Sequence, residues 1–215
     1  MNIRSAIELN EYLNSELGWR KRDLTNAKFA IAGSKEHARE TMIRGAICLL
    51  YAHWEGFIKH ACMAYLNYLA KQGLTQREAA PSIIAYCMAG RFRALADTKK
   101  YSLVSDIVST MIGPGSEPLS IPWDKVMDDT ANLNSVVLRE IAHIVCIDYS
   151  HYETKEKLID EKLLRARHAI AHGDRQTVIL ADYEELHGQV LSLIELFRNQ
   201  VENSAILGSY RRPQS

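Results

Sequence analysis

The chain has 215 residues, of which 47% are hydrophobic and 24% are charged, and its 26 Lys and Arg side chains balance 26 Asp and Glu side chains. These values predict an ordinary globular core and exclude a disordered or fibrous protein. The even charge balance argues against a protein that grips a long duplex through a basic face, so any contact with nucleic acid must be local or built from two copies.

Apolar residues at helical spacing divide the first half of the chain into helices, and the small numbers of Pro (5) and Gly (11) favour long ones. We predict a first helix over residues 2–32 and a second from about 35 to 71, whose broad apolar stripe makes it the central core helix. A capping box at residues 75–78 predicts a third helix over roughly 76–97, and a short fourth follows at 103–112.

The second half of the chain begins after a Pro- and Gly-rich loop at 113–122. Start and stop signals then predict three more helices, over about 134–146, 150–172 and 182–206. Gly173 lies where a left-handed residue would end the second of these helices. Asp182 and Glu185 have the spacing of a capping box that would open the third.

We therefore expect a single all-α domain over residues 1–215, with N-terminal helices at about 2–112 and C-terminal helices at about 134–206. No apolar signal run opens the chain, and its most apolar stretch, 46–58, is too short to span a bilayer. The cysteines form no C-x-x-C pair, so we interpret them as reduced core thiols. A cytoplasmic protein without a membrane partner is the expectation.

The residues best suited to chemistry are two arginines and two histidines near one predicted helix end, namely Arg165, Arg167, His168 and His172. Arg donates paired hydrogen bonds to a phosphate and stays charged, whereas His can take or give a proton near neutral pH. Together they suit cleavage of an RNA phosphodiester by its own 2′-hydroxyl, a reaction that needs no metal. The common phosphate-binding, dinucleotide-binding, nucleophile-elbow and zinc-protease motifs are absent from the sequence.

The spacing of Arg167 and His172 poses a geometric problem. Residues five apart point roughly 140° from each other on a regular helix, so one rigid helix cannot easily aim both at one phosphate. Either the helix unwinds near His172, or a second copy supplies the missing half. Two other interpretations of the cluster stay open: Arg and His at a helix C-terminus satisfy the helix dipole, and His168 and His172 at i, i+4 could bind zinc, although no further ligand completes a set.

Glu55 is the other candidate residue, because it lies within an otherwise apolar run at 49–58 where a carboxylate must be paired. One possibility is an i, i+4 ion pair with Lys59 on a solvated edge. The other is that Glu55 faces the Arg/His cluster and orients it. Trp54 and Phe57 in the same run are interpreted as core residues.

The Arg167-x4-His172 pattern, followed by Gly173, resembles the R-x4–6-H signature of the HEPN superfamily. The segments 50–59, 132–148 and 182–187 are similar to one stand-alone prokaryotic branch of that superfamily and occur in the expected order, so the resemblance covers most of the chain.

The resemblance implies an up-and-down helical bundle with additional helices that forms a two-fold homodimer, with the motif helix ends facing each other in a composite cleft. Many members are metal-independent endoribonucleases that act as toxins or antiviral effectors. Arg167 and His172 match the motif pair, and Glu55 matches the acidic position of the branch. His168 stands where many members have Asn. Asp174 stands where members modified by nucleotidyltransferase antitoxins have Tyr, so that form of control is not predicted.

We therefore predict a homodimeric endoribonuclease that requires neither a metal nor another cofactor. The predicted catalytic residues are Arg167, His172, His168 and Glu55, and the predicted RNA-binding residues are Arg165, Arg175 and Lys162. Its partners would be RNA, a second copy, and an antitoxin or defence-system protein. The alternatives are a non-catalytic RNA- or nucleotide-binding module that acts through a partner, and a purely structural helical dimer.

Overall fold

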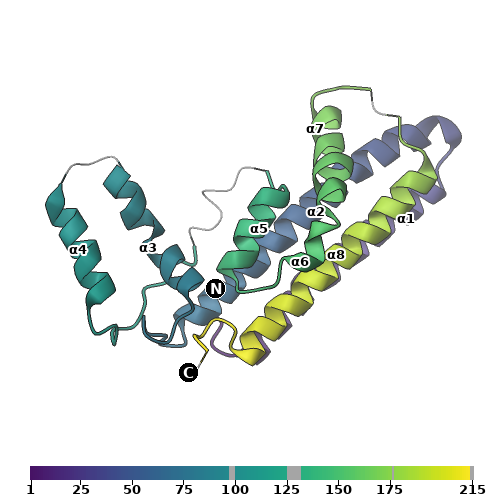
Figure 1. The fold of residues 1–215 in the computed structure, drawn as a ribbon. Helices are drawn as coiled ribbons and strands as arrows, with labels where there is room; N and C mark the ends of the chain where they lie inside the picture. The colour runs from purple at the N-terminus through teal and green to yellow at the C-terminus, as the bar shows by residue number, and fades with distance from the viewer. Residues whose placement is uncertain (97–99, 125–131, 176, 214–215) are drawn as a thin grey trace.

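The computed structural model describes residues 1–96, 100–124, 132–175 and 177–213. These residues form helices and connecting segments, with two isolated β-bridges and no strand among them (Figure 1). The predicted all-α class is therefore confirmed. Within the same residues, no helix is both long and apolar enough to cross a membrane.

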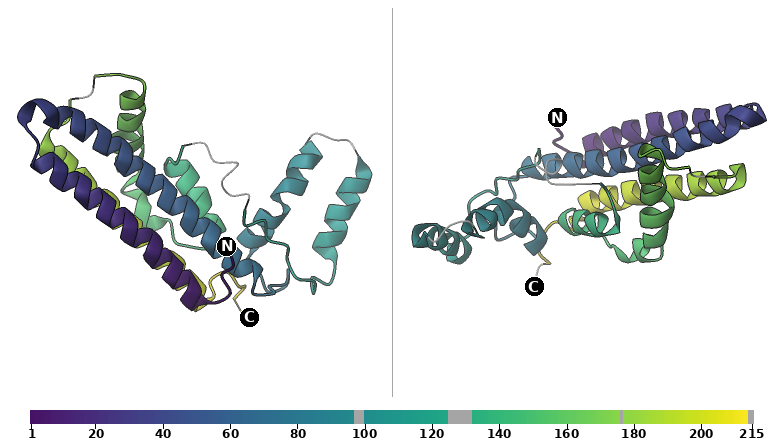
Figure 2. Two further views of the ribbon diagram at one scale, coloured as in Figure 1. Left: turned by 180° about the vertical axis from the view of Figure 1, so that it is seen from behind. Right: turned by 90° about the horizontal axis from the view of Figure 1, so that it is seen from above.

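Three long helices form the main body of the molecule: α1 (Ala6–Ala32), α2 (Glu36–Ala70) and α8 (Leu180–Leu207). They lie side by side and each contacts the other two (Figure 2). Helix α2 is the central core helix, as its apolar stripe predicts. Trp54 and Phe57 are both fully buried, so their interpretation as core residues is confirmed.

Two shorter helices, α3 (Pro81–Ala96) and α4 (Tyr101–Ile112), project from the end of the long helices where both termini lie (Figure 1). Helix α3 begins later than predicted. The Thr75–Glu78 hydrogen bonds of the capping box do form, with Thr75 Oγ1 donating to Glu78 Oε2 over 2.8 Å, but they close a turn. The helix starts at Pro81, whose missing N–H costs nothing at a first helical position.

The remaining short elements lie between α4 and α8 in sequence: α5 (Ser135–Ile144), α6 (Ser150–Glu153), the π-helix η1 (Leu158–Arg165) and α7 (Ala166–Ala171). Asn134 caps α5 as predicted, since its Oδ1 accepts a hydrogen bond of 2.8 Å from the backbone N–H of Val137. Both η1 and α7 pack against α2.

The predicted continuous helix over 150–172 is wrong. A turn follows α6, and the helix then resumes with a wider π segment before it becomes α-helical at Ala166. In the π segment, Asp160 accepts hydrogen bonds from the backbone N–H of Ser135 (2.7 Å) and from its hydroxyl (2.6 Å). This tie to the start of α5 accompanies the widened turn, and π segments often occur at functional sites.

The predicted capping box at the start of the last helix is also wrong. Helix α8 begins at Leu180 with extended Ile179 at its N-cap, so Asp182 already lies inside the first turn. Its side chain makes no capping hydrogen bond. Asp182 and Glu185 instead line a pocket that faces η1 and α7.

Candidate functional site

The helix end that carries the Arg/His cluster has a well-defined backbone stop. Gly173 has φ of +85°, its N–H donates to Ile170 O (3.1 Å), and the Asp174 N–H donates to Ala169 O (2.9 Å). This pair of bonds is a Schellman motif, which satisfies the last carbonyls of a helix and requires a left-handed residue at the position of Gly173. The prediction for Gly173 is confirmed, and His172 is fixed as the C-cap residue.

Arg167 is half-buried and turned toward α2. Its Cζ lies 4.3 Å from the centroid of the Tyr51 ring, and its Nη2 donates a hydrogen bond to Asn132 Oδ1. Tyr51 is only 2% exposed, so the ring is a rigid support for the guanidinium. A cation over an aromatic face is stabilised by about 0.5–2 kcal/mol. No carboxylate pairs with Arg167 among the residues that the structure describes.

Tyr51 is affected by the same packing. Burial raises the pKa of its hydroxyl above the usual value, and the adjacent Arg167 guanidinium opposes that rise. The phenol is therefore neutral at any ordinary pH. It offers Arg167 a polarisable ring without a negative charge that would neutralise it.

The two histidines lie beyond Arg167 at the end of α7. The ring centroids of His168 and His172 are 6.2 Å apart and the rings are inclined by 34°. His172 is exposed and His168 is half-buried. Within the described part of the chain, no hydrogen bond joins either imidazole ring to Arg167. One copy therefore presents Arg167 against α2 and His172 toward solvent, as the five-residue spacing leads one to expect.

Glu55 is not joined to this cluster. Its Oε1 accepts a hydrogen bond of 2.6 Å from Lys59 Nζ, one helical turn along α2. This is the ion pair that sequence spacing offers as one alternative, although Lys59 is only 12% exposed and the edge is less solvated than expected. No hydrogen bond or ion pair connects Glu55 to Arg167, His168 or His172 among the described residues. An orienting role for Glu55 stays a prediction without a direct contact to support it.

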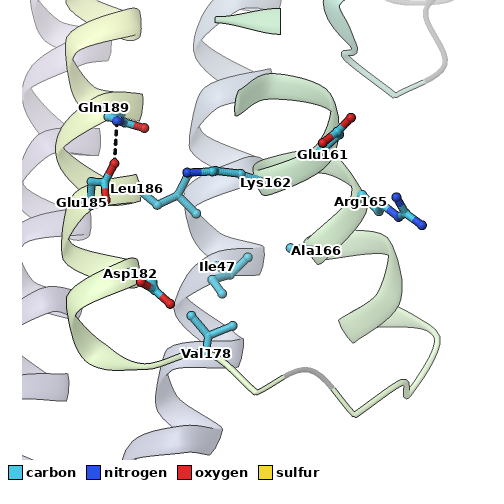
Figure 3. Close-up of a pocket in the computed structure, with 10 residues that line it drawn as sticks. All are labelled: Ile47, Glu161, Lys162, Arg165, Ala166, Val178, Asp182, Glu185, Leu186 and Gln189. Atoms are coloured by element: carbon cyan, nitrogen blue, oxygen red, sulfur yellow. Dashed lines mark hydrogen bonds between the residues drawn. The ribbon is translucent and has the colours of Figure 1, made fainter. Parts of the chain in front are cut away.

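The predicted RNA-binding residues Lys162, Arg165 and Arg175 are all exposed. The first two line a pocket of about 550 Å³ between η1, the start of α7, α2 and α8 (Figure 3). Arg175 does not line it and follows the Schellman stop. The pocket is lined by Ile47, Glu161, Lys162, Arg165, Ala166, Val178, Asp182, Glu185, Leu186 and Gln189.

Sequence reasoning missed Tyr51 and Asn132, the two residues that hold Arg167. Both lie in segments singled out for their resemblance to the family, but neither residue type stands out there as a support for an arginine. Asn132 lies 35 residues from Arg167 in sequence, and the Asp160–Ser135 hydrogen bonds fix the neighbouring backbone. In the described residues, no group of three or more His, Cys, Asp or Glu side chains could hold a metal ion.

Comparison with known proteins gives one match. The family profile described as MAE_28990-like HEPN matches residues 9–210. No curated protein and no solved structure matches the chain. The match covers α2, α8 and all but the first residues of α1, together with the segment that carries Arg167 and His172. This chain therefore belongs to the MAE_28990-like HEPN family.

Proposed function

We propose that the protein is a metal-independent endoribonuclease that cleaves RNA by attack of the 2′-hydroxyl on the adjacent phosphate. The observation that carries this proposal is Arg167, whose guanidinium is fixed by a neutral ring and an amide on the helix that ends in exposed His172. No carboxylate of the described residues pairs with it. Membership of the HEPN family supports it, because HEPN domains are frequently ribonucleases. A fixed, unneutralised cation suits the extra negative charge that a phosphate gains in the transition state.

The chemistry needs two proton transfers. As the 2′-oxygen bonds to phosphorus, a base accepts the hydroxyl proton; as the P–O5′ bond breaks, an acid gives a proton to O5′. The products carry a 2′,3′-cyclic phosphate on one side and a 5′-hydroxyl on the other. His172 is the residue proposed for proton transfer, and Arg167 stabilises the phosphorane between the two steps. His168 lies beside His172 and assists by hydrogen bonding or by a local charge.

A second copy completes the proposed site. Arg167 turns toward α2 while His172 faces solvent, so one copy does not direct both at the same phosphate. Two-fold pairing of the α7 ends would bring two His172 side chains together, one as base and one as acid, flanked by both copies of Arg167. If so, excess His172→Ala protein should inhibit the wild type by forming mixed dimers. A wild-type rate that does not change under this excess would contradict the two-copy site.

The test of the activity is cleavage of RNA in excess chelator. Wild type should cut and leave 2′,3′-cyclic phosphate ends, and a strand with 2′-deoxyribose at the cleaved position should resist. Arg167→Ala should slow cleavage by about 100- to 1000-fold, the usual loss when a preorganised transition-state donor is removed. Equal cleavage of the deoxy-substituted strand, or by the variant, would refute the proposal.

The biological role that we propose is that of a toxin or an antiviral effector. Growth of a bacterial host that expresses the wild type should stop, whereas expression of His172→Ala protein at the same level should be tolerated. Growth inhibition that persists in the variant would assign the toxicity to another property of the fold. If only the wild type is toxic, the proposed partner is an antitoxin or a defence-system protein that restrains it.

One observation favours the alternative of an RNA-binding module that acts through a partner. Helix α4 carries a row of exposed apolar side chains at helical spacing, namely Tyr101, Val104, Val108, Met111 and Ile112. A cluster of this kind on a projecting helix is typical of a protein-interaction surface. Retained RNA binding with no cleavage at any pH from acid to alkaline would support this function over the nuclease.

A further inference from the structure

The pocket beside α7 has the size and floor of a nucleotide site. Its volume of about 550 Å³ falls in the range of small-molecule pockets. Ile47 of α2 and Leu186 of α8 contribute buried apolar surface, and Ala166 and Val178 extend it (Figure 3). An apolar floor with a few polar groups around it is typical of a small-molecule pocket, and the face of a planar base can lie on such a floor.

The polar groups of the pocket come from opposite walls. Asp182 lies on α8 and makes no hydrogen bond or ion pair within the described chain, because α8 begins before it and leaves it without a capping role. Lys162 lies on η1, has no ion pair among the described residues, and extends across the pocket toward α8 (Figure 3). Glu185 is already engaged, since its Oε1 accepts a hydrogen bond of 2.9 Å from Gln189 Nε2.

A lysine and a carboxylate that face one pocket from opposite walls can together select one base. The Watson–Crick edge of guanine presents an acceptor, O6, followed by two donors, N1–H and N2–H. A lysine ammonium can only donate and a carboxylate can only accept, so Lys162 matches O6 and Asp182 matches the two donors. Adenine and cytosine place a donor where the lysine would donate, and uracil offers a single donor to the carboxylate. We propose that this pocket binds the guanine base of a guanosine nucleotide.

The position of the pocket relative to Arg167 suggests where that nucleotide comes from. Ile47 in the floor and Tyr51 under Arg167 are one turn apart on α2, which separates their Cβ atoms by only about 5–6 Å. Ala166 of the pocket directly precedes Arg167. A guanosine in the pocket is therefore within one nucleotide step of the proposed phosphate site. Exposed Arg165 points away from the pocket on its rim, where an adjoining phosphate would pass (Figure 3).

This inference deepens the proposed nuclease function and rests on it for the source of the base, but base binding can be measured without cleavage. Calorimetric titration of the full chain with GMP, AMP, CMP and UMP should show GMP bound at least about tenfold more tightly than the others, because only guanine satisfies both Lys162 and Asp182. IMP, which lacks the 2-amino group, should bind more weakly than GMP. Equal binding of all nucleotides, or no binding, would overturn the guanine pocket.

Asp182→Asn removes the carboxylate while keeping its size, and it should weaken GMP binding by about tenfold or more. Glu184→Gln is the matched control on the same helix: this carboxylate pairs with Lys28 at 3.6 Å and does not line the pocket. It should bind GMP like the wild type. Equal losses in both variants would show that charge on α8, and not the pocket, governs binding.

Mapping of the cleaved positions distinguishes a guanosine of the RNA strand from a free guanine nucleotide. Cuts next to guanosine that become random in Asp182→Asn would assign the base to the RNA strand. GMP binding together with cuts that ignore guanosine would assign the pocket to a free guanine nucleotide. A protein that binds GMP but never cuts RNA would refute the nuclease and leave the pocket standing. Cleavage of RNA without any GMP binding would refute the guanine pocket and leave the nuclease standing.

Discussion

Arg20 and Arg167 are both held against aromatic rings, and they differ in what neutralises them. Arg20 of α1 is only 3% exposed and forms an ion pair with Glu16, while its Nη1 also donates to Glu16 O over 2.9 Å. Its guanidinium lies 4.4 Å from the Trp19 ring centroid and within reach of Phe57. Arg167 has one ring and one amide, and no carboxylate in the described chain.

This difference separates a structural arginine from one that is available to a ligand. Burying a charge is costly unless it is paired, and Arg20 meets that requirement with Glu16. Arg167 is only half-buried, so solvent and the Asn132 amide suffice, and its charge is left for an anion. Among the described residues, the Nε atoms of both arginines are buried without a hydrogen-bond partner, so the two side chains differ in the ion pair with Glu16 and in the deeper burial of Arg20.

The largest expected effect is on catalysis at Arg167. Arg167→Ala should lower the cleavage rate by about 100- to 1000-fold, and Arg167→Lys should restore only a small part because a lysine lacks the planar fork. Its free energy of unfolding should change little, by about 1 kcal/mol, since only one ring contact and one hydrogen bond are lost. Cleavage assays and urea unfolding on the same preparations check both numbers. A variant that loses stability to the same degree as activity would make Arg167 structural.

Arg20→Ala should show the opposite pattern. It leaves Glu16 without its cation and removes the packing over Trp19 and Phe57, so the free energy of unfolding should fall by about 3 kcal/mol. Protein that remains folded should cleave RNA at the wild-type rate per folded molecule. Urea unfolding and cleavage at a temperature where the variant is folded give the two readouts. Lost cleavage in a fully folded Arg20→Ala protein would erase the distinction between the two arginines.

A substitution at Asn132 can give Arg167 the carboxylate partner that Arg20 has. Asn132→Asp would place a negative charge where the amide now accepts from Arg167 Nη2. The new ion pair should raise stability by up to about 1 kcal/mol while cleavage falls by about tenfold, because Arg167 would then resemble Arg20. Asn132→Ala, which removes the hydrogen bond without adding charge, should lower the rate less. A faster Asn132→Asp enzyme would contradict the account of Arg167.

The smallest expected effect is a loss of stability in acid that arises from His187. It must be separated from any effect of pH on His172. Burial lowers the pKa of His187, with nearby Lys28 acting in the same direction. Below the ordinary histidine pKa of about 6.5 the unfolded chain takes up a proton that the folded chain resists, so stability is present above that pH and is lost as the pH falls. Urea midpoints at pH 7.5 and 5.5 should differ, and His187→Gln should reduce the difference. A pH-independent midpoint in the wild type would contradict the burial effect.

Local sequence patterns predicted the features of this fold that depend on residues close together in the sequence. The apolar stripe of α2 placed Trp54 and Phe57 in the core, and the spacing of Gly173 from the apolar run predicted its left-handed stop. The patterns failed where distant contacts override local signals. Spacing alone cannot distinguish an α-helix from the π segment at Leu158–Arg165, which lies where Asp160 reaches across to Ser135.

The candidate site divides in the same way. Arg167 and His172 could be found because they form a short motif, whereas Tyr51 and Asn132 reach Arg167 only through the packing of three separate elements. The capping signal at Asp182 and Glu185 was overridden because α8 starts at Leu180. That displacement leaves Asp182 in the pocket without a partner among the described residues, so the failed prediction marks the residue proposed to recognise guanine.

The most direct measurement is the initial rate of RNA cleavage, in excess chelator, by wild type, His172→Ala and His143→Ala. His143 is a matched control because it is also an exposed histidine near a helix C-terminus, in the last turn of α5. We predict that His172→Ala loses cleavage by about 100-fold or more while His143→Ala cuts like the wild type and all three unfold alike. Equal cleavage by His172→Ala and His143→Ala would show that this helix end is not the catalytic site.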